Sequence, residues 1–181
     1  TDNWSIVDFD RSEYYNLYVR GDNGEVGFST TDNTPSTDDF YSGVSVNDGN
    51  WHHIAAVYDG TDKVIYVDGI EVARKVNAHS GNNLGTGLTR YGFIGDGSEA
   101  SSLNGTRNNI YYNGAVDEVR LWNSVRTPSE INNNKDICLT GAEPNLTAYY
   151  NFDENTGSIL NDRTGNGNNG TLYNFPASPW I

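Results

Sequence analysis

The sequence predicts an all-β fold, a sandwich of antiparallel sheets that forms a single domain over residues 1–181. Three observations predict it. Residues 63–67 and 70–73 are two strand-like runs separated by Asp68-Gly69, the spacing and residue types of a tight two-residue hairpin. Short alternating segments recur along the chain with turn residues between them. The composition, with 12 Tyr, 4 Trp, 6 Phe and 20 Gly, suits an aromatic, β-rich core with many turns.

Strand-like segments alternate apolar and polar residues in the pattern of a half-buried strand. In chain order they are residues 5–9, 13–20, 24–29, 51–58, 63–67, 70–75, 91–95, 114–122 and 147–152. The longest loops between them, rich in Gly, Asn, Ser and Thr, are residues 30–40, 77–89 and 97–109. Loops of this length are either functional or tolerated insertions.

One short helix is expected after Thr127. Thr127-Pro128-Ser129-Glu130 is a capping box with proline at the first helical position, so Thr127 and Glu130 can each satisfy a free backbone amide. Because residues 131–134 are poor helix formers, the helix should end near Lys135 after about two turns.

The formal net charge is −13, from 24 acidic and 11 basic residues. A nucleic-acid partner is excluded because binding to phosphate needs a basic footprint. The acidic excess fits a solvated surface or divalent cations. No apolar run approaches the ~20 residues that span a bilayer, so we expect no membrane insertion.

Cys138 is the single cysteine, so an internal disulfide is impossible, and we expect the thiol to be buried and inert. His52 and His53 are neighbours in a predicted strand and face opposite sides, so they cannot share a zinc ion; one should be packed and the other exposed. The chain contains no Met, even at position 1, so we expect a processed product or a piece of a larger polypeptide.

Three motifs in a fixed order carry a family resemblance: NWHHIAAVYDGTDKVIYVDGIEVA, YNGAVDEVRLWNSVRTPSEI and LTAYYNFDENTGSILNDRTGNGNNGTL. Over most of residues 48–175 the chain resembles the laminin-G-like, or concanavalin A-like, domains of secreted bacterial proteins. The resemblance implies a jelly-roll sandwich of two antiparallel sheets, a scaffold shared by lectins, glucanases, polysaccharide lyases and adhesion modules. The fold does not choose among these functions.

The chain departs from the family at its beginning. Such domains usually open with a strand pair, including an Asn-Asp-Tyr-like element, before the region that matches residues 4–20. We expect these opening strands to be missing, to be replaced by residues 148–180, or to be supplied by another polypeptide, because an unpaired sheet edge invites aggregation.

The resemblance also implies a structural calcium ion. Asp117, in the run VDEVRLW, matches a family position that ligates calcium. Because calcium takes six to eight oxygen ligands, Asp117 needs partners such as Asp153 or loop carbonyls. The alternative is that Asp117 hydrogen-bonds a neighbouring loop. The acidic runs 32–39 and 96–99 lack the pattern of a helical calcium loop, and we expect them to be solvated.

Catalysis is not expected. A retaining glycosidase needs two carboxylates ~5–5.5 Å apart, commonly at i and i+4 of one strand. No E-x-D-x-x-E segment occurs, the glutamates lie on different elements, and Asp117 and Glu118 should face opposite sides of a strand. Lyase chemistry would need a spaced set of neutralising and basic residues, which the sequence lacks.

Sugar binding would use aromatic rings that stack on pyranose faces and Asn, Asp or Arg side chains that bond hydroxyls. The candidate aromatic residues, each of which could instead belong to the core, are Tyr41, Tyr91, Tyr111, Tyr112 and Trp180. Trp51 and His53 match family positions that most often serve packing.

These observations favour a noncatalytic carbohydrate-recognition module of a larger extracellular protein, secreted or at the cell surface, with a structural calcium ion and a polysaccharide or glycan as its partner. One alternative is a structural or cell-adhesion domain that binds a protein partner. The other is a polysaccharide-cleaving enzyme.

Overall fold

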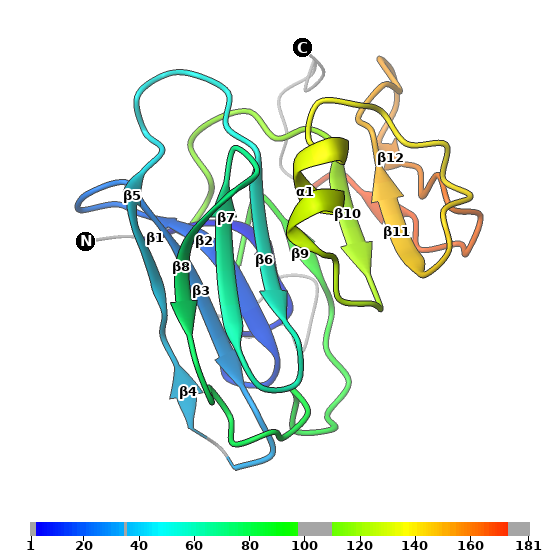
Figure 1. Ribbon diagram of the computed structural model, residues 1–181. Coiled ribbons are helices and arrows are strands. Elements are labelled where there is room, and N and C mark those ends of the chain that lie inside the picture. The colour runs from blue at the N-terminus through cyan, green and yellow to red at the C-terminus, as the bar shows by residue number, and fades with distance from the viewer. Residues whose placement is uncertain (1–2, 35, 98–109, 174–181) are drawn as a thin grey trace. The chain divides into compact units, whose positions relative to one another are not determined.

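The computed structural model describes residues 3–34, 36–97 and 110–173. The chain forms two compact units, Thr1–Gly114 and Ala115–Ile181. The first holds strands β1 to β9, and the second holds helix α1 and strands β10 to β13 (Figure 1). The single domain expected over residues 1–181 stays a prediction.

The larger sheet of the first unit is antiparallel and has the order β4-β3-β2-β1-β9, with β5 also paired to β3. Its strands are β1 (Asn3–Asp8), β2 (Tyr15–Arg20), β3 (Glu25–Thr31), β4 (Thr37–Asp38), β5 (Tyr41–Ser45) and β9 (Phe93–Ile94). β1 lies between β2 and β9, so the strand nearest the start of the chain is paired on both sides.

The smaller sheet of the first unit contains β6 (Ile54–Tyr58), β7 (Lys63–Val67) and β8 (Ile70–Lys75), all antiparallel. Val67 pairs with Ile70 across the turn, and Asp68 and Gly69 have φ of 53° and 80°, as a type I′ turn requires. The hairpin prediction is therefore confirmed at the residues that defined it.

The two sheets of the first unit face each other across a hydrophobic core (Figure 1). Its fully buried members are Val26 and Phe28 of β3 and Ile65 and Val67 of β7. Partly buried residues such as Tyr15 and others on β2, β6 and β8 pack against them. Alternating side chains from both inner faces thus meet in one layer, which confirms the predicted sandwich.

The second unit pairs β10 (Val119–Trp122) with β11 (Leu146–Tyr150), and β12 (Ile159–Leu160) with β13 (Gly170–Thr171). Helix α1 (Pro128–Asn134) begins with the predicted capping box: Glu130 N donates to Thr127 Oγ1 at 3.2 Å, and Thr127 N donates to Glu130 Oε2 at 2.8 Å. At its other end Arg120 Nη1 donates to Asn134 O at 2.7 Å. Antiparallel sheets with one short helix are the predicted fold class.

Two local expectations are wrong. Cys138 is exposed rather than buried, because it lies in the loop that follows α1 and not in a strand. His52 and His53 precede β6 instead of lying within it, so the opposite-face argument does not apply, and both are half-buried. Among the residues with described positions, no helix has the length and apolar character needed to cross a membrane.

Candidate functional site

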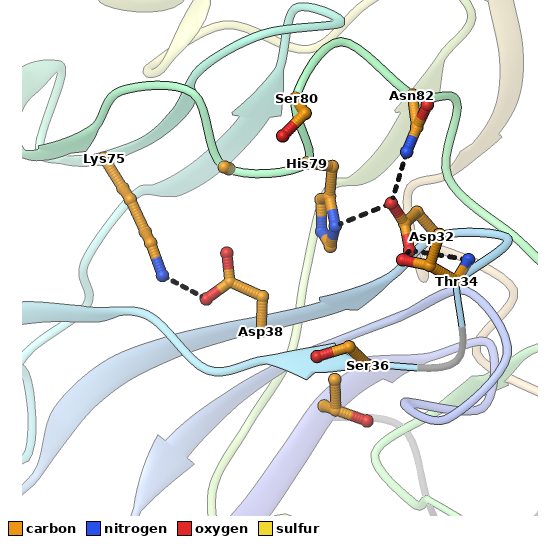
Figure 2. Close-up of a pocket in the computed structure, with 10 residues that line it drawn as sticks. Asp32, Thr34, Ser36, Asp38, Lys75, His79, Ser80 and Asn82 are labelled. Carbon is orange, nitrogen blue, oxygen red and sulfur yellow. Dashed lines mark hydrogen bonds and ion pairs between the residues drawn. The ribbon is translucent and has the colours of Figure 1, made fainter.

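A polar pocket of about 430 Å³ opens in the first unit, where the loop after β3 meets the loop after β8 (Figure 2). Ten residues line it: Asp32, Thr34, Ser36, Thr37, Asp38, Lys75, Ala78, His79, Ser80 and Asn82. All but Ala78 carry a polar or charged group. The two loops that build the pocket are those at residues 30–40 and 77–89.

Asp32 is the fixed point of the pocket. Its Oδ1 accepts hydrogen bonds from Thr34 N at 2.9 Å and Thr34 Oγ1 at 2.6 Å, a local Asx-type turn that follows β3 directly. Its Oδ2 accepts from Asn82 Nδ2 at 2.8 Å. Burial favours a raised pKa for this carboxyl, but the hydrogen bonds from Thr34 and Asn82 outweigh burial and lower the pKa below its ordinary value. The Asp32 carboxylate is therefore ionised, and both of its oxygens accept hydrogen bonds.

His79 packs behind Asp32. Its Nε2 lies 2.6 Å from Thr30 Oγ1, its Nδ1 lies 3.5 Å from Asp32 Oδ2, and its ring stands edge-on to Tyr58 at 5.7 Å between centroids. Burial lowers the pKa of this imidazole despite the nearby carboxylate of Asp32. His79 is thus held as a neutral ring that ties β3 to the loop after β8.

The order Thr30, His79, Asp32 is that of a hydrolytic triad, in which a base activates a hydroxyl nucleophile. Thr30, however, is fully buried and does not line the pocket. A substrate in the pocket could not reach its hydroxyl. The three residues therefore form a structural connection rather than a nucleophilic centre.

Asp38 is held by two lysines of the smaller sheet. Lys75 Nζ contacts Asp38 Oδ1, and Lys63 Nζ donates to Asp38 O at 2.6 Å. Lys63 has no exposed side-chain surface and lies 5.3 Å and 5.6 Å from the ring centroids of Phe28 and Phe40. Burial lowers the pKa of its ammonium to about 8, although the charge of Asp38 opposes this shift. These contacts fix β4 against the ends of β7 and β8.

The free faces of the pocket carry hydroxyl, carboxylate and ammonium groups. Ser36 and Ser80 line opposite walls, and Asp38 and Lys75 lie to one side (Figure 2). Its lining residues include no Phe, Tyr or Trp ring. Within residues 3–34, 36–97 and 110–173, no three His, Cys, Asp or Glu side chains are grouped to hold a metal ion. The pocket is suited to a small ligand with several hydroxyl groups.

The tyrosines predicted to bind sugar lie at opposite edges of the larger sheet. Tyr41 is on β5, 39% exposed, with the guanidinium of Arg20 4.6 Å from its ring centroid. Tyr91 precedes β9, and Tyr112 N donates to Gly95 O at 2.9 Å just after that strand. Tyr91 and Tyr111 are about half exposed. Burial raises the pKa of Tyr112.

None of these four tyrosines lines the pocket. Tyr41 is separated from the others by β3, β2 and β1, so one sugar ring could not stack on both groups. Trp180 lies outside the described residues. The assignment of these five aromatic residues to a ligand stays a prediction.

The residues predicted to hold calcium lie in the second unit and influence each other. Burial raises the pKa of Asp117, and the negative charges of Glu118 and Asp153 raise it further. Glu118 is already engaged, since Tyr149 Oη and Arg120 Nη2 donate to it at 2.8 Å and 2.5 Å. Asp117 and Asp153 are therefore two carboxylates close enough to interact, and the positive charge of Arg120 opposes their effect on the pKa of Asp117.

An orphaned oxygen lies beside Asp153. Asn151 Nδ2 donates to Asp153 Oδ2 at 2.7 Å, while the buried Oδ1 of Asn151 has no hydrogen-bond partner in the described part of the chain. Carboxylate and amide oxygens are the ligand types that calcium prefers. The donor set therefore fits a calcium ion in kind, and calcium binding stays a proposal.

Sequence reasoning missed the pocket and one exposed aromatic residue. The run 32–39 was expected to be solvated, yet Asp32 is 3% exposed and the side chain of Asp38 is 13% exposed. Trp51 was expected to pack and is instead 66% exposed. The available signal was the length and polarity of loops 30–40 and 77–89, which does not reveal that they meet.

Two solved structures resemble the chain. A protein from Bacteroides ovatus, described as a "putative carbohydrate binding protein", has a TM-score of 0.71 and 22% identity, over 94% of this chain and 47% of its own. An S-layer domain-containing protein from Clostridium thermocellum has a TM-score of 0.38 and 24% identity, over 73% of this chain and 62% of its own. The chain thus spans about half the length of the Bacteroides protein. No curated protein matches.

The Bacteroides structure has the same fold over nearly the whole chain. The family model described as the concanavalin A-like lectin/glucanases superfamily matches residues 1–132, which include both sheets of the first unit and the start of the second. The chain therefore belongs to the concanavalin A-like lectin/glucanase superfamily.

Proposed function

We propose that the chain is a noncatalytic glycan-recognition module of a larger extracellular protein, with a structural calcium ion in its second unit. The observation that carries the proposal is the polar pocket of the first unit. The superfamily includes lectins by name, and the structural neighbour from Bacteroides ovatus is described as a "putative carbohydrate binding protein", so both comparisons support the same ligand class.

The pocket is organised before a ligand arrives. Asp32 is fixed by Thr34 and Asn82, and Asp38 by Lys63 and Lys75. A site that is already ordered loses less conformational entropy when it binds, so more of the interaction energy contributes to affinity. Such an arrangement suits a weakly hydrophobic, hydroxyl-rich ligand.

The charges of the pocket favour a neutral sugar. The two carboxylates are balanced by the ammonium groups of Lys63 and Lys75, and the lowered pKa of His79 keeps its ring uncharged. The chain as a whole carries −13, which repels anionic ligands. Hydroxyl groups of a neutral hexose can donate to Asp38 and accept from Lys75 or the serines.

The noncatalytic assignment is supported by the state of Asp32, the most buried carboxylate of the pocket. A glycosidase needs one carboxyl group with a raised pKa that can donate a proton. The pKa of Asp32 is lowered instead, and its oxygens already accept three hydrogen bonds. A glucanase activity, which the superfamily name permits, would therefore have to use other residues.

The pocket assignment is tested with a panel of soluble polysaccharides in affinity electrophoresis. Ala78→Phe places a ring inside the pocket, and Ala142→Phe makes the same change at an exposed alanine of the second unit. We expect a glycan to retard the wild type and the Ala142→Phe variant. The Ala78→Phe variant should not be retarded, and its melting temperature should be unchanged. Equal retardation of all three proteins would contradict the pocket, and release of reducing ends would contradict the noncatalytic assignment.

The calcium assignment has its own test. Calcium bound only to the folded state stabilises it in proportion to the logarithm of ligand excess, so chelation should lower the melting temperature by several degrees. Asp117→Asn should have the lowered melting temperature already and should not respond to chelator. Asp136→Asn, at a carboxylate exposed elsewhere in the second unit, is the control. A wild-type melting temperature that does not change on chelation would contradict the calcium proposal.

A further inference from the structure

We infer that Trp51 is a second glycan contact, a stacking surface for one neutral pyranose unit at the end of the smaller sheet opposite to the pocket. The inference rests on the proposed function and adds a site to it. β6 runs from the Trp51 end at Ile54 to the pocket end at Tyr58, a rise of roughly 13 Å, so the two sites lie at opposite ends of this strand. Figure 1 shows the β5–β6 connection and the β7–β8 turn at one end and β4 at the other.

Trp51 is displayed by a loop that is held rigidly on both sides of it. On one side, Asn50 N donates to Asp48 Oδ1 at 2.9 Å. On the other, the ring of His52 bridges two carboxylates, with Nε2 3.1 Å from Asp48 Oδ1 and Nδ1 2.9 Å from Asp68 Oδ2. The backbone that carries Trp51 is therefore held on both sides of this residue, and the side chain is 66% exposed.

The β7–β8 turn secures the same loop through its backbone. His53 N donates to Asp68 Oδ1 at 2.9 Å, and Asp68 N donates to His53 O at 2.8 Å. Asp68 can do this because it occupies the left-handed first position of the turn, with φ of 53°. The turn that defines the hairpin thus also orients the tryptophan loop.

The exposed apolar surface of the indole is unfavourable in water unless a ligand covers it. Removing apolar surface from water is favourable, and the exposed indole of Trp51 forgoes this stabilisation in the free protein. A loop fixed by two carboxylates and a histidine, with its large apolar side chain turned to solvent, matches a rigid aromatic contact for a ligand. A sugar ring covers the indole face with its C–H groups.

The rim around Trp51 selects the class of sugar. The side chains of Asp48 and Asp68 are 54% and 48% exposed, so their carboxylates can accept hydrogen bonds from sugar hydroxyls. Backbone and side-chain hydrogen bonds to Asn50, followed by those to His52, lower the pKa of Asp48 to about 2, so it stays ionised. Two carboxylates repel uronate and sulfate groups, which leaves neutral pyranoses as the ligand.

The pocket and Trp51 offer complementary kinds of contact to a polysaccharide. The pocket provides polar contacts without a Phe, Tyr or Trp ring among its lining residues, and Trp51 provides such a ring at the surface. A polysaccharide that contacts both sites gains from the effective concentration of the second contact after the first has formed. Short oligosaccharides should therefore bind more weakly than long ones.

The test compares Trp51→Ala, Trp51→Tyr and Tyr173→Ala with the wild type. Tyr173 is another exposed aromatic residue, in the second unit, at 55%. Binding to soluble mixed-linkage β-glucan, galactomannan and polygalacturonate is measured by affinity electrophoresis, with melting temperatures as the folding control. For a neutral polysaccharide that the wild type binds, Trp51→Ala should weaken binding about tenfold and Trp51→Tyr by less, because a ring remains.

The outcomes separate the two proposals. Tyr173→Ala should bind as the wild type does, and polygalacturonate should not bind. If the wild type binds a neutral polysaccharide and Trp51→Ala binds it equally well, the Trp51 contact is wrong while glycan recognition stands. If the wild type binds none of a broad panel of neutral glycans, both proposals are wrong. Binding of polygalacturonate with Trp51 dependence would overturn the neutral ligand class.

Discussion

The two ends of the smaller sheet use the same residue types in opposite settings. At the pocket end, His79 lies against Asp32 and both side chains are 4% exposed. At the turn end, His52 lies between Asp48 and Asp68, whose side chains are about half exposed. Burial lowers the pKa of His79, whereas hydrogen bonds to Asp68 and Asp48 raise the pKa of His52. The surroundings, and not the Asp–His pairing, decide which form of the histidine is favoured.

The same contrast separates the lysines that meet Asp38. Lys63 is fully buried and is packed near two phenylalanine rings, whereas the side chain of Lys75 is 42% exposed. Both contact Asp38, Lys63 chiefly at the backbone carbonyl and Lys75 at the carboxylate, so a comparison between them sets a buried partner against an exposed one. Exposed ion pairs contribute little to stability, while breaking a buried one leaves a charge without compensation.

The largest expected effect is therefore at the pocket end. Lys63→Ala should lower the free energy of unfolding by about 3 kcal/mol or more, because it removes a buried partner of Asp38 and leaves a cavity. Lys75→Ala should lower it by less than about 1 kcal/mol. Urea denaturation of both variants measures the difference. Equal losses would show that burial does not separate the two lysines.

The next effect is at the turn end. Asp68→Ala should lower the free energy of unfolding by about 1–2 kcal/mol, since alanine tolerates the left-handed conformation poorly and cannot accept from His53 N. Asp68→Asn keeps both properties and should cost less. The same denaturation experiment checks this order, and an alanine variant as stable as the asparagine variant would refute it.

The smallest effect is in the pH dependence of stability, where the two histidines should act with opposite sign. His79 has a pKa below its ordinary value of 6.5, so the unfolded chain binds the proton more readily and stability falls as pH drops below 6.5. His52 has a raised pKa, so its contribution is complete below 6.5 and is lost as pH rises through the higher value.

Melting temperatures measured from about pH 5 to pH 8, the range in which histidines titrate, check these signs. His79→Asn should reduce the loss of melting temperature that occurs as pH falls below 6.5. His52→Asn should reduce the loss of melting temperature that occurs as pH rises above 6.5. The opposite assignment, or two variants with identical profiles, would show that the two settings do not differ as described.

Local rules explain why some elements could be predicted to the residue. The turn Asp68-Gly69 and the capping box of Thr127 and Glu130 depend on residues close together in the chain, and both are present. Strands β4 and β5 were not predicted, because both form by pairing with β3 rather than from a strong pattern of their own. The strand predicted from residue 51 begins instead at Ile54, because His53 is bound to Asp68.

The candidate site depended on contacts that the sequence does not encode locally. Asp32 and Asn82 are joined by a side-chain hydrogen bond although 50 residues separate them. Loops 30–40 and 77–89 could be recognised as long and polar, but their meeting follows from the stacking of the two sheets. Trp51 was assigned to packing by analogy, and only the geometry of its loop shows the indole facing solvent.

One measurement tests glycan recognition most directly: an NMR titration of the folded chain with a neutral oligosaccharide prepared from any polysaccharide that retards it. Glycan recognition at these two sites should shift the backbone amides of Thr34 and of residues 36–38 and 75–82 and the indole N–H of Trp51, with no shifts in the second unit. Saturating ligand that moves none of these signals, or that moves only residues of the second unit, would contradict it.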